Sequence, residues 1–391
     1  MISYEEAYKA VISRARVLSA EAVPLGEARG RVLAEDILID MDMPPFDKSA
    51  MDGYACRKED LPGPLRVVEV IQAGVAPQKD IGPGECAKIM TGAKIPNGAD
   101  WVVMVEHCTT DGEDRVLIIG PVEEANICIQ GEDLRCGDKL LDRGLLLESR
   151  HIALLATAGY AAPKVIRRPR VGLIATGSEL VEPEHKPGTC QIRNSNSWQI
   201  CAQMEETGAK VRYYGIVGDV EDDLDRIMKH ALVENDVVLF SGGVSMGDYD
   251  FVPGVMARNG LTLIFEAVAM RPGKPTTFGV GADAFCFGLP GNPVSTFLQC
   301  EILVKPFLYA LMGHVFKAPW RWCVLSDAYT RKRTGRAAWV PVLRVDEDTV
   351  KPAPYHGSAH ISALSSSFGF MVIPPQVAGV EEGARTKIWV L

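Results

Sequence analysis

The chain has 391 residues, of which 47% are hydrophobic and 23% are charged, and its formal net charge is -9. This composition is typical of a soluble globular protein with room for several cores and about two to four domains. The acidic balance argues against general binding to nucleic acid or to a membrane surface, while a local basic pocket is compatible with it.

The cysteine spacing and the N-terminal residues indicate the cellular compartment. The ten cysteines are scattered, none forms a C-x-x-C pair, and no Cys/His cluster has the spacing of a zinc site. Free thiols of this kind are typical of a reducing cytosol. Residues 1–6 are acidic and lack the apolar core of a signal peptide, and no apolar run approaches the ~18 residues of a membrane span. We therefore expect a cytoplasmic protein that does not enter a membrane.

The first part of the chain predicts a helix followed by many short strands. Ser3 and Glu6 form a capping box, and apolar residues then recur at helical spacing. We expect an elongated α+β region over residues 1–44 and 144–168, with an all-β insert over residues 45–143. Expected strands of the insert are residues 65–71, 85–90, 101–105, 116–119 and 139–141, and a helix is expected over 149–158.

Two polar loops of the insert are candidate ligand contacts. In the first, Ser49 and Asp52 follow the pair Pro44-Pro45, which breaks regular structure. The residues alone favour a solvated loop, and a loop that presents Ser49 and Asp52 to a ligand is the alternative. In the second, Thr91 is placed to contact a phosphate or a pterin, and a structural turn is equally compatible with the sequence.

From residue 169 to 313 strands alternate with helices, which predicts a mostly parallel, doubly wound α/β sheet. A long helix is expected from Pro293 to about Met312, because proline is favoured at the first helical position and Gly313 follows the expected end. Residues 319–391 return to short strands with Gly/Pro turns and predict a small β-barrel. Expected strands of the α/β domain are residues 171–175, 211–217, 236–240, 261–268, 276–280 and 284–287.

Residues 241–250, Ser-Gly-Gly-Val-Ser-Met-Gly-Asp-Tyr-Asp, follow a short buried strand. Backbone N–H groups around Gly242 and Gly243 can face an anion, because glycine lets a ligand approach the chain closely. Asp248 and Asp250 supply oxygen ligands for a divalent cation. Taken alone, Gly-Gly is more often a plain turn and Asp at a helix start is more often an N-cap.

Four polar motifs are expected at strand ends of the α/β domain, where open sheets bind ligands. They are residues 176–180, 241–250, 271–275 and 288–295. We expect all four to line one crevice. Arg271 and Lys274 supply positive charge for an oxyanion, and Glu179 with the two aspartates supplies hard oxygen ligands for Mg²⁺. The start of the helix at Pro293 adds N–H donors, so a phosphate-bearing ligand is predicted.

At these motifs the sequence resembles the molybdopterin molybdenumtransferase family, which comprises MoeA-type proteins and the E domain of gephyrin. The resemblance covers essentially the whole chain, and so many spaced motifs in one order make it specific. Arg271 stands where the family usually has lysine, which keeps the charge but presents a planar guanidinium. The motifs that carry the resemblance are residues 44–47, 49–55, 90–93, 131–133, 176–180, 241–245, 272–275 and 289–295.

The resemblance implies an enzyme that inserts molybdate into adenylated molybdopterin and releases AMP, assisted by a divalent cation such as Mg²⁺. It also implies a homodimer whose active site lies between the α/β domain of one subunit and the N-terminal insert of the other. Asp52 and Thr91 would come from that insert. The adenylyltransferase and the acceptor molybdoenzymes are the protein partners that this function suggests.

The same resemblance assigns roles residue by residue. The expected catalytic residues are Asp52, Glu179, Asp250 and Lys274. The expected metal ligands are Glu179, Asp219, Asp248 and Asp250, and Asp219 keeps an equal interpretation as a helix N-cap. The expected substrate or oxyanion contacts are Ser49, Thr91, Gly242, Gly243, Ser245, Arg271, Pro290, Asn292, Pro293 and Ser295.

Two other functions fit parts of the sequence. An adenylyltransferase that makes the adenylated pterin from ATP uses a related α/β domain, although the all-β insert and the C-terminal module match the transferase. A non-catalytic scaffold similar to gephyrin's E domain needs none of the charged motifs. The sequence does not distinguish molybdate from tungstate, because both are tetrahedral dianions of similar size.

Overall fold

The computed structural model describes residues 1–245, 247 and 250–391. The chain forms two compact units. The first comprises Met1–Ala34, Gly144–Glu148 and Lys164–Leu391, and the second comprises Glu35–Arg143 and Ser149–Pro163.

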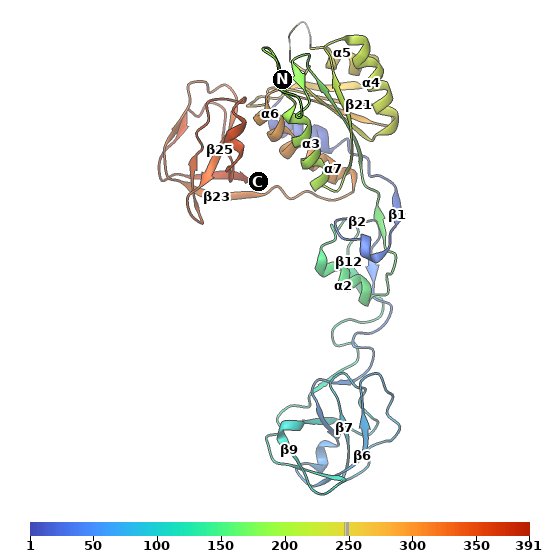
Figure 1. The fold of residues 1–391 in the computed structure, drawn as a ribbon. Helices are drawn as coiled ribbons and strands as arrows, with labels where there is room; N and C mark the ends of the chain where they lie inside the picture. Colours follow the sequence, from blue (N-terminus) through green and yellow to red (C-terminus); the bar gives the residue numbers. More distant parts are fainter. Residues whose placement is uncertain (246, 248–249) are drawn as a thin grey trace. The chain divides into compact units, whose positions relative to one another are not determined.

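The first unit is built on a six-stranded sheet with the order β17-β14-β18-β22-β21-β19 (Figure 1). The four strands from β17 to β22 run parallel, and β21 and β19 run antiparallel to their neighbours. The predicted mostly parallel sheet is therefore confirmed. The strands are β14 (Arg170–Thr176), β17 (Lys210–Val217), β18 (Val237–Ser241), β19 (Thr262–Ala267), β21 (Pro275–Val280) and β22 (Phe285–Leu289).

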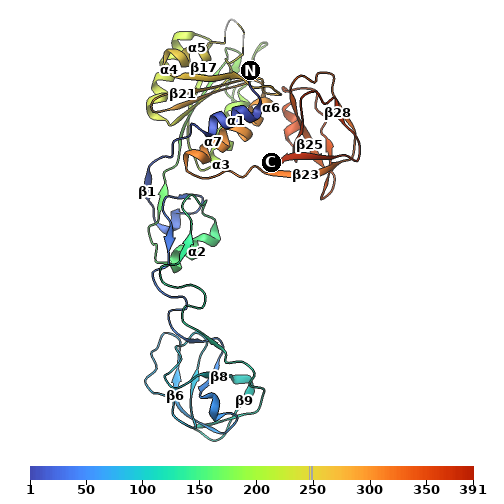
Figure 2. The same ribbon diagram turned by 180° about the vertical axis from the view of Figure 1, so that it is seen from behind.

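Helices cover both faces of this sheet, as a doubly wound fold requires. Alternate residues of β18 point to opposite faces: Leu239 packs in one core cluster and Phe240 in the other. Figures 1 and 2 show the two groups of helices on the two sides of the sheet. One face carries α1 (Tyr4–Ile12), α3 (Ser195–Glu206), α6 (Pro293–Gln299) and α7 (Lys305–Leu311), and the other carries α4 (Glu221–Glu234) and α5 (Val252–Arg258).

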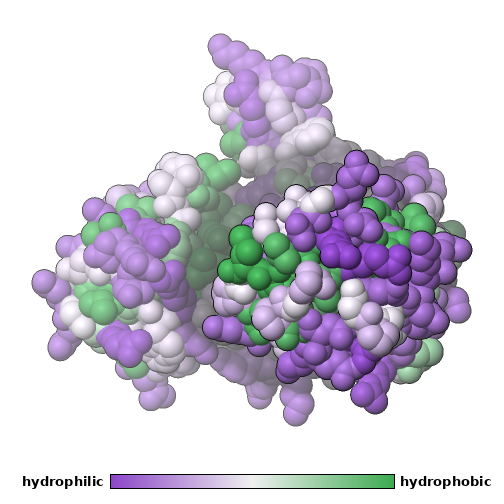
Figure 3. All heavy atoms as spheres, turned by 90° about the horizontal axis from the view of Figure 1, so that it is seen from below, coloured by the Kyte–Doolittle hydropathy of each residue, from purple (hydrophilic) through white to green (hydrophobic). Residues whose placement is uncertain are grey.

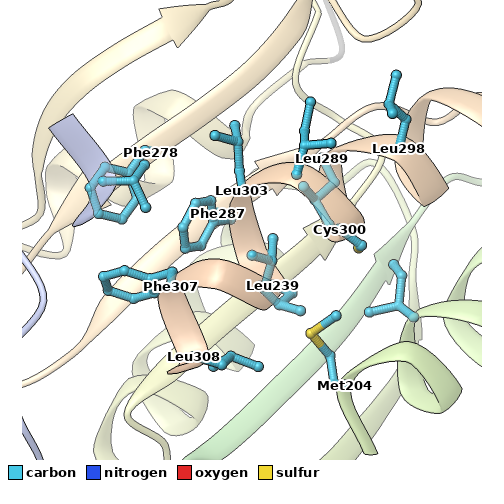
Figure 4. Close-up of a cluster of buried hydrophobic side chains, with 14 of the residues drawn as sticks. Met204, Leu239, Phe278, Phe287, Leu289, Leu298, Cys300, Leu303, Phe307 and Leu308 are labelled. Atoms are coloured by element: carbon cyan, nitrogen blue, oxygen red, sulfur yellow. The ribbon is translucent and has the colours of Figure 1, made fainter. Parts of the chain in front are cut away.

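The larger cluster is centred on aromatic rings beneath the antiparallel part of the sheet (Figure 4). The ring centroid of Phe278 lies 4.6 Å from that of Phe287 and 5.6 Å from that of Phe307. All three side chains are fully buried. Burying each contributes about 2–3 kcal/mol relative to exposure, so the strands that carry the polar motifs rest on a rigid base.

The long helix expected from residue 293 is present but is not uniformly α-helical. A π-helical segment, η4 (Cys300–Val304), separates α6 from α7. Pro306 follows it and has no N–H to donate into an α-helical ladder, which accounts for the local change in hydrogen bonding. The span Pro293–Leu311 is long and apolar enough to cross a membrane, but 78% of it is buried, as in the core helix of a globular fold.

Residues after 319 form the predicted small barrel. Five strands close on themselves, because β25 pairs with both β26 and β27 while β23 and β29 complete the ring. A short strand of the α/β domain, β20 (Met270–Arg271), pairs with β25 in parallel. The barrel strands are β23 (Trp320–Leu325), β25 (Ala337–Arg344), β26 (Thr349–Pro352), β27 (Gly369–Ile373) and β29 (Arg385–Val390), and β24 (Tyr329–Thr330) pairs with β28 (Gly379–Val380) beside them.

The second unit contains the predicted all-β insert, with a six-stranded sheet in the order β8-β5-β7-β6-β10-β9. The expected strand at 139–141 does not join this sheet: β12 (Lys139–Leu141) pairs with β3 (Ile37–Leu38), which precedes the insert. Sequence pattern gives a strand but not its partner. The sheet consists of β5 (Gly53–Cys56), β6 (Leu65–Ile71), β7 (Glu85–Ile89), β8 (Trp101–Met104), β9 (Cys108–Thr110) and β10 (Arg115–Ile118).

Smaller elements complete the chain. In the second unit β4 (Lys48–Ser49) pairs with β11 (Ile127–Cys128), and helix α2 spans Ser149–Thr157. In the first unit a three-stranded sheet is formed by β1 (Ala20–Ala22), β13 (Lys164–Ile166) and β2 (Val32–Leu33). The face shown in Figure 3 is mostly hydrophilic, with apolar residues in small groups, as on a water-exposed surface.

Candidate functional site

A cavity of about 760 Å³ opens at the carboxyl ends of β14 and β18. The chain runs from β14 outward to β17 and then returns to the other side of β14 as β18, so strand order reverses between these two strands. Open α/β sheets bind ligands at such a point. Residues from all four predicted motifs line the cavity: Thr176, Gly177, Glu179, Ser241, Gly242, Gly243, Ser245, Asp250, Pro275, Asn292 and Pro293.

The glycine-rich turn after β18 packs tightly against the end of β14. Gly242 and Gly243 have φ angles of +96° and +65°. A Cβ on Gly242 would lie 2.6 Å from Thr176 O, and one on Gly243 would lie 2.7 Å from Thr176 Oγ1. Both positions therefore require glycine. The N–H of Gly242 donates to Leu289 O over 3.0 Å. The expectation that this N–H faces an anion is wrong, because it holds the turn to β22.

Among the described residues, three carboxylates line the cavity: those of Glu179, Asp219 and Asp250. Asp219 Oδ2 accepts the N–H of Ser178 over 3.0 Å, and Asp250 Oδ2 accepts the N–H of Gly247 over 2.8 Å. Asp219 is not a helix N-cap, since helix α4 begins after Val220 without a side-chain cap. This removes the N-cap interpretation, and the interpretation of Asp219 as a metal ligand stays a prediction.

The remaining predicted metal ligand, Asp248, lies outside the described residues. Within the described residues, no three His, Cys, Asp or Glu side chains are grouped closely enough to hold a metal ion by themselves. The carboxylates of the cavity therefore offer one or two protein ligands at a time. Mg²⁺ commonly binds in this way, with the rest of its shell taken from phosphates and water.

The loop 271–275 reaches the same edge of the sheet, as predicted. It follows β19, which runs in the same direction as the four parallel strands because β19 and β22 are both antiparallel to β21. Gln299 Nε2 and Thr276 Oγ1 both donate to Gly273 O, over 2.7 Å and 3.0 Å. These buried bonds fix the loop between helix α6 and the sheet.

The two cations of this loop line different cavities. Lys274 lines a second cavity of about 940 Å³, which shares Val244, Ser245 and Pro275 with the first. Arg271 lines a third cavity of about 530 Å³ at the junction with the barrel. The structure thus separates Arg271 and Lys274, which the sequence suggested would hold one oxyanion together.

The third cavity is strongly basic. Arg271 meets Arg331, Lys332 and Arg333 there, together with Ser358, and none of its described lining residues is acidic. Burial lowers the pKa of Arg331, and the nearby charge of Arg271 lowers it further, while Tyr329 acts in the opposite sense. Cations held together without a carboxylate favour an anion between them.

Sequence reasoning missed this cluster. The run Arg331-Lys332-Arg333, followed by Arg336, was a detectable signal in an acidic protein. The pairing of β20 with β25 brings it beside Arg271.

The motif 288–295 serves the site mainly through its backbone and Asn292. Asn292 and Pro293 line the first cavity, whereas Pro290 and Ser295 are buried and do not present their side chains to a ligand. Asn292 Nδ2 donates to Ser358 Oγ over 2.9 Å, and Ser358 O accepts the N–H of Val294 over 3.1 Å. The motif therefore binds the barrel to the α/β domain as well as lining the cavity.

The start of helix α3 adds a residue that was not predicted. Asn196 lines the first cavity and donates to Gly291 O over 2.8 Å and to Ser241 Oγ over 3.2 Å. It connects two of the predicted motifs through one side chain. The residue before it in the chain, Ser195, also lines the cavity, so the N-terminal turn of the 12-residue helix α3 faces the ligand space.

In the second unit the predicted residues Asp52 and Thr91 are exposed and bonded to each other. Ser49, by contrast, is 1% exposed, and its hydroxyl donates to Met51 O over 2.6 Å. The prediction that Ser49 contacts a ligand is therefore wrong, because its side chain stabilises the loop that presents Asp52.

Comparison with known proteins agrees with this architecture. Three family models match the chain in order: "MoeA N-terminal region (domain I and II)" over residues 2–159, "Probable molybdopterin binding domain" over residues 172–310, and "MoeA C-terminal region (domain IV)" over residues 324–391. A doubly wound sheet with a cavity at its switch point, joined to a closed barrel, thus has the form of a molybdopterin-binding protein.

Comparison with individual relatives identifies the family more closely. The molybdopterin molybdenumtransferase of Staphylococcus aureus is 36% identical over 405 residues, which cover 99% of this chain and 95% of that protein. The protein of the same name from Staphylococcus epidermidis is 35% identical and covers 98% and 94%. The crystal structure of the molybdopterin biosynthesis MoeA protein from Pyrococcus horikoshii OT3 has 30% identity and a TM-score of 0.86 over the full length of both chains. This chain belongs to the molybdopterin molybdenumtransferase (MoeA) family.

Proposed function

We propose that the protein inserts molybdate into adenylated molybdopterin and releases AMP. The observation that carries the proposal is the juxtaposition of a carboxylate-lined cavity with a basic one, joined by the anchored loop 271–275. The first suits a cation-bound phosphate, and the second suits a tetrahedral oxyanion. Further support comes from the relatives: the one from Staphylococcus aureus, which the chain matches over almost its full length, is named a molybdopterin molybdenumtransferase. The α/β domain also matches the model of a probable molybdopterin binding domain.

The chain's own residues act by positioning and charge. Arg271 holds molybdate in the basic cavity, and Lys274 neutralises the phosphate bridge from the adjoining cavity. Arg331 contributes its charge, because its three guanidinium nitrogens already donate to backbone carbonyls. Glu179 and Asp250 would position the adenylate phosphates through a divalent cation, which both carboxylates can bind. No side-chain nucleophile is needed, because bringing two anions together against their repulsion is the main barrier that this site lowers.

A divalent cation fits the donor set of the first cavity. Glu179, Asp219 and Asp250 offer the hard carboxylate oxygens that Mg²⁺ prefers, and two of them are already oriented by backbone N–H groups. When bound, the cation polarises the phosphoanhydride link between the pterin phosphate and AMP. Molybdate enters as the substrate.

We further propose that the working protein is a homodimer in which Asp52 and Thr91 of one subunit serve the α/β cavity of the other. The support is chemical. Asp52 is exposed, and two hydrogen bonds from Thr91 lower the pKa of its carboxyl, so a negative charge is available at the surface of this loop. Ten free cysteines favour a reducing, cytoplasmic setting. The adenylyltransferase and acceptor molybdoenzymes are the protein contacts that this step suggests.

The test is AMP release from adenylated molybdopterin by the purified protein with Mg²⁺, with and without molybdate. Molybdate-dependent release with formation of active cofactor is the expected result. Consumption of ATP without molybdate would instead identify an adenylyltransferase. Pterin binding without any release would identify a scaffold and overturn the proposed enzyme.

A further inference from the structure

Three aliphatic residues that line the first cavity, here called the apolar rim, take no part in the chemistry above: Leu180, Ile192 and Ile361. Leu180 and Ile192 are register partners in the parallel pair β15 (Leu180–Val181) and β16 (Ile192–Arg193), so their side chains lie next to each other on one face. Both line the cavity. Ile192 is 57% exposed, which leaves much of its apolar surface in water.

A third aliphatic residue reaches the same cavity from the barrel. Ile361 begins the short helix η5 (Ile361–Leu364), is 45% exposed and lines the cavity with Ala359. This segment is held against the α/β domain through Ser358, which bonds to Asn292 and Val294. The apolar rim is therefore assembled from two domains that share hydrogen bonds at its base.

Much of the remaining lining of the cavity is polar. Asn194, Asn196 and Arg193 line it beside the three carboxylates, and the first turn of helix α3 faces into it. An apolar rim on a polar floor fits a ligand with a flat apolar ring at one end and a charged group at the other. A purely apolar ligand would leave the polar floor desolvated without partners.

We propose that Leu180, Ile192 and Ile361 hold the heteroaromatic ring of a phosphate ester whose phosphate lies on the polar floor. The inference rests on the proposed function, whose substrate carries two such rings, adenine and pterin. Aliphatic side chains cover ring faces without requiring hydrogen bonds, so they fix the position of the ring while the floor fixes the phosphate. Ile361 makes the barrel a direct contributor to substrate binding.

The experiment compares ligands with and without a ring. Full-length Ile192→Ser and Ile361→Ser variants are titrated calorimetrically, in the presence of Mg²⁺, with AMP, ribose 5-phosphate and molybdopterin. Val345→Ser is the matched control, because Val345 is 52% exposed on the barrel and is not among the residues that line the first cavity. Ile192→Leu and Ile361→Leu keep aliphatic surface and are expected to restore binding.

If adenine is the ring, each serine variant raises the Kd of AMP by about five- to tenfold and leaves that of ribose 5-phosphate unchanged. If the pterin is the ring, molybdopterin binding weakens and AMP binding does not. Three results would overturn the proposal: equal weakening of AMP and ribose 5-phosphate, unchanged binding of all three probes, or a change of oligomeric state in the serine variants alone. Wild-type AMP release at saturating substrate tests the proposed function separately, because it does not depend on these variants.

Discussion

Asp52 Oδ1 accepts two hydrogen bonds from Thr91, one from the backbone N–H at 2.7 Å and one from the hydroxyl at 2.9 Å. The backbone bond and then the hydroxyl bond hold the pKa of the Asp52 carboxyl below its ordinary value, although the residue is exposed. Two distant loops of the second unit are thereby joined around one stable negative charge.

Removing the Thr91 hydroxyl should shift the acid limb of the pH–activity profile. A carboxyl with a depressed pKa keeps its charge as pH falls, so Thr91→Val, which raises that pKa toward its ordinary value, is expected to lose activity at a higher pH than wild type. Carboxyl titration by NMR and the pH dependence of kcat/KM provide the measurement. Thr91→Ser keeps the bond and should follow wild type. If the acid limbs of the kcat/KM profiles of Thr91→Val and wild type coincide, ionisation of Asp52 does not limit the reaction.

Arg271 should govern the response to molybdate. Arg271→Ala removes one cation from the basic cavity and is expected to raise the molybdate concentration for half-maximal AMP release by about tenfold or more. Arg271→Lys keeps the charge but loses the planar pair of donors. Its molybdate concentration for half-maximal AMP release should therefore lie between those of wild type and Arg271→Ala. A half-saturation value for Arg271→Ala equal to that of wild type would show that molybdate binds elsewhere.

Asp250 should matter for chemistry and not for folding. Asp250→Asn keeps a side-chain oxygen that can accept the N–H of Gly247 but loses the charge. We expect AMP release to fall by about a hundredfold or more, with the thermal unfolding midpoint unchanged. Asp283→Asn, an exposed aspartate on another loop, is the control. Normal turnover by Asp250→Asn would exclude the assigned role.

Mixing two inactive variants tests the shared site. In a homodimer whose sites each combine Lys274 of one subunit with Asp52 of the other, an Asp52→Ala and Lys274→Ala heterodimer keeps one intact site. Random reassociation of equal amounts should restore about a quarter of wild-type AMP release. Complementation is absent if each site draws both residues from one chain.

Arg167 and Asp236 should dominate acid stability of the first unit. Arg167 Nη1 and Nη2 lie 2.7 Å from Asp236 Oδ2 and Oδ1, and the aspartate side chain is 8% exposed. Burial alone would raise the pKa of Asp236, but the bonds from Arg167 and the Arg170 N–H outweigh it and lower that pKa. Arg167→Met removes the two shortest side-chain bonds to this buried charge and leaves only Arg170 beside it, so the free energy of unfolding is expected to fall by about 3 kcal/mol.

The pH dependence of this pair has a definite sign. Because the folded pKa of Asp236 is depressed, its contribution is present above the unfolded pKa and is lost as pH falls through the folded one. Urea unfolding at neutral and acid pH should show a smaller acid loss in the Arg167→Met, Asp236→Asn double variant than in wild type. An equal acid loss in both would assign the effect to other carboxylates.

Much of the fold follows from local patterns. Ser3 and Glu6 predict the capped helix α1, and both hydrogen bonds of the capping box are present. Alternation of strands and helices predicts the doubly wound sheet. The direction of β21 and the pairing of β12 with β3 depend on long-range packing, and no local pattern encodes them.

The residues of the candidate site also fall into those that local sequence predicts and those that depend on long-range packing. Glu179 and Asp250 were predicted because strand ends meet at one edge of a parallel sheet, and both line the cavity. Arg331 was missed because its approach to Arg271 depends on strand pairing between two domains. Ser49 and Ser295 were overassigned, since sequence gives a hydroxyl but not the direction in which it points.

The barrel of this protein is not a detachable appendage. Trp339, Phe370 and Trp389 are buried in the same core cluster as helices α3 and α6, and the ring of Trp339 lies 5.2 Å from that of Tyr4 in the first helix of the chain. A chain shortened before residue 319 would expose that aromatic surface and lose the partner of β20 at Arg271. The barrel and the α/β domain therefore share part of one hydrophobic core, and we expect the two to unfold together in one cooperative transition.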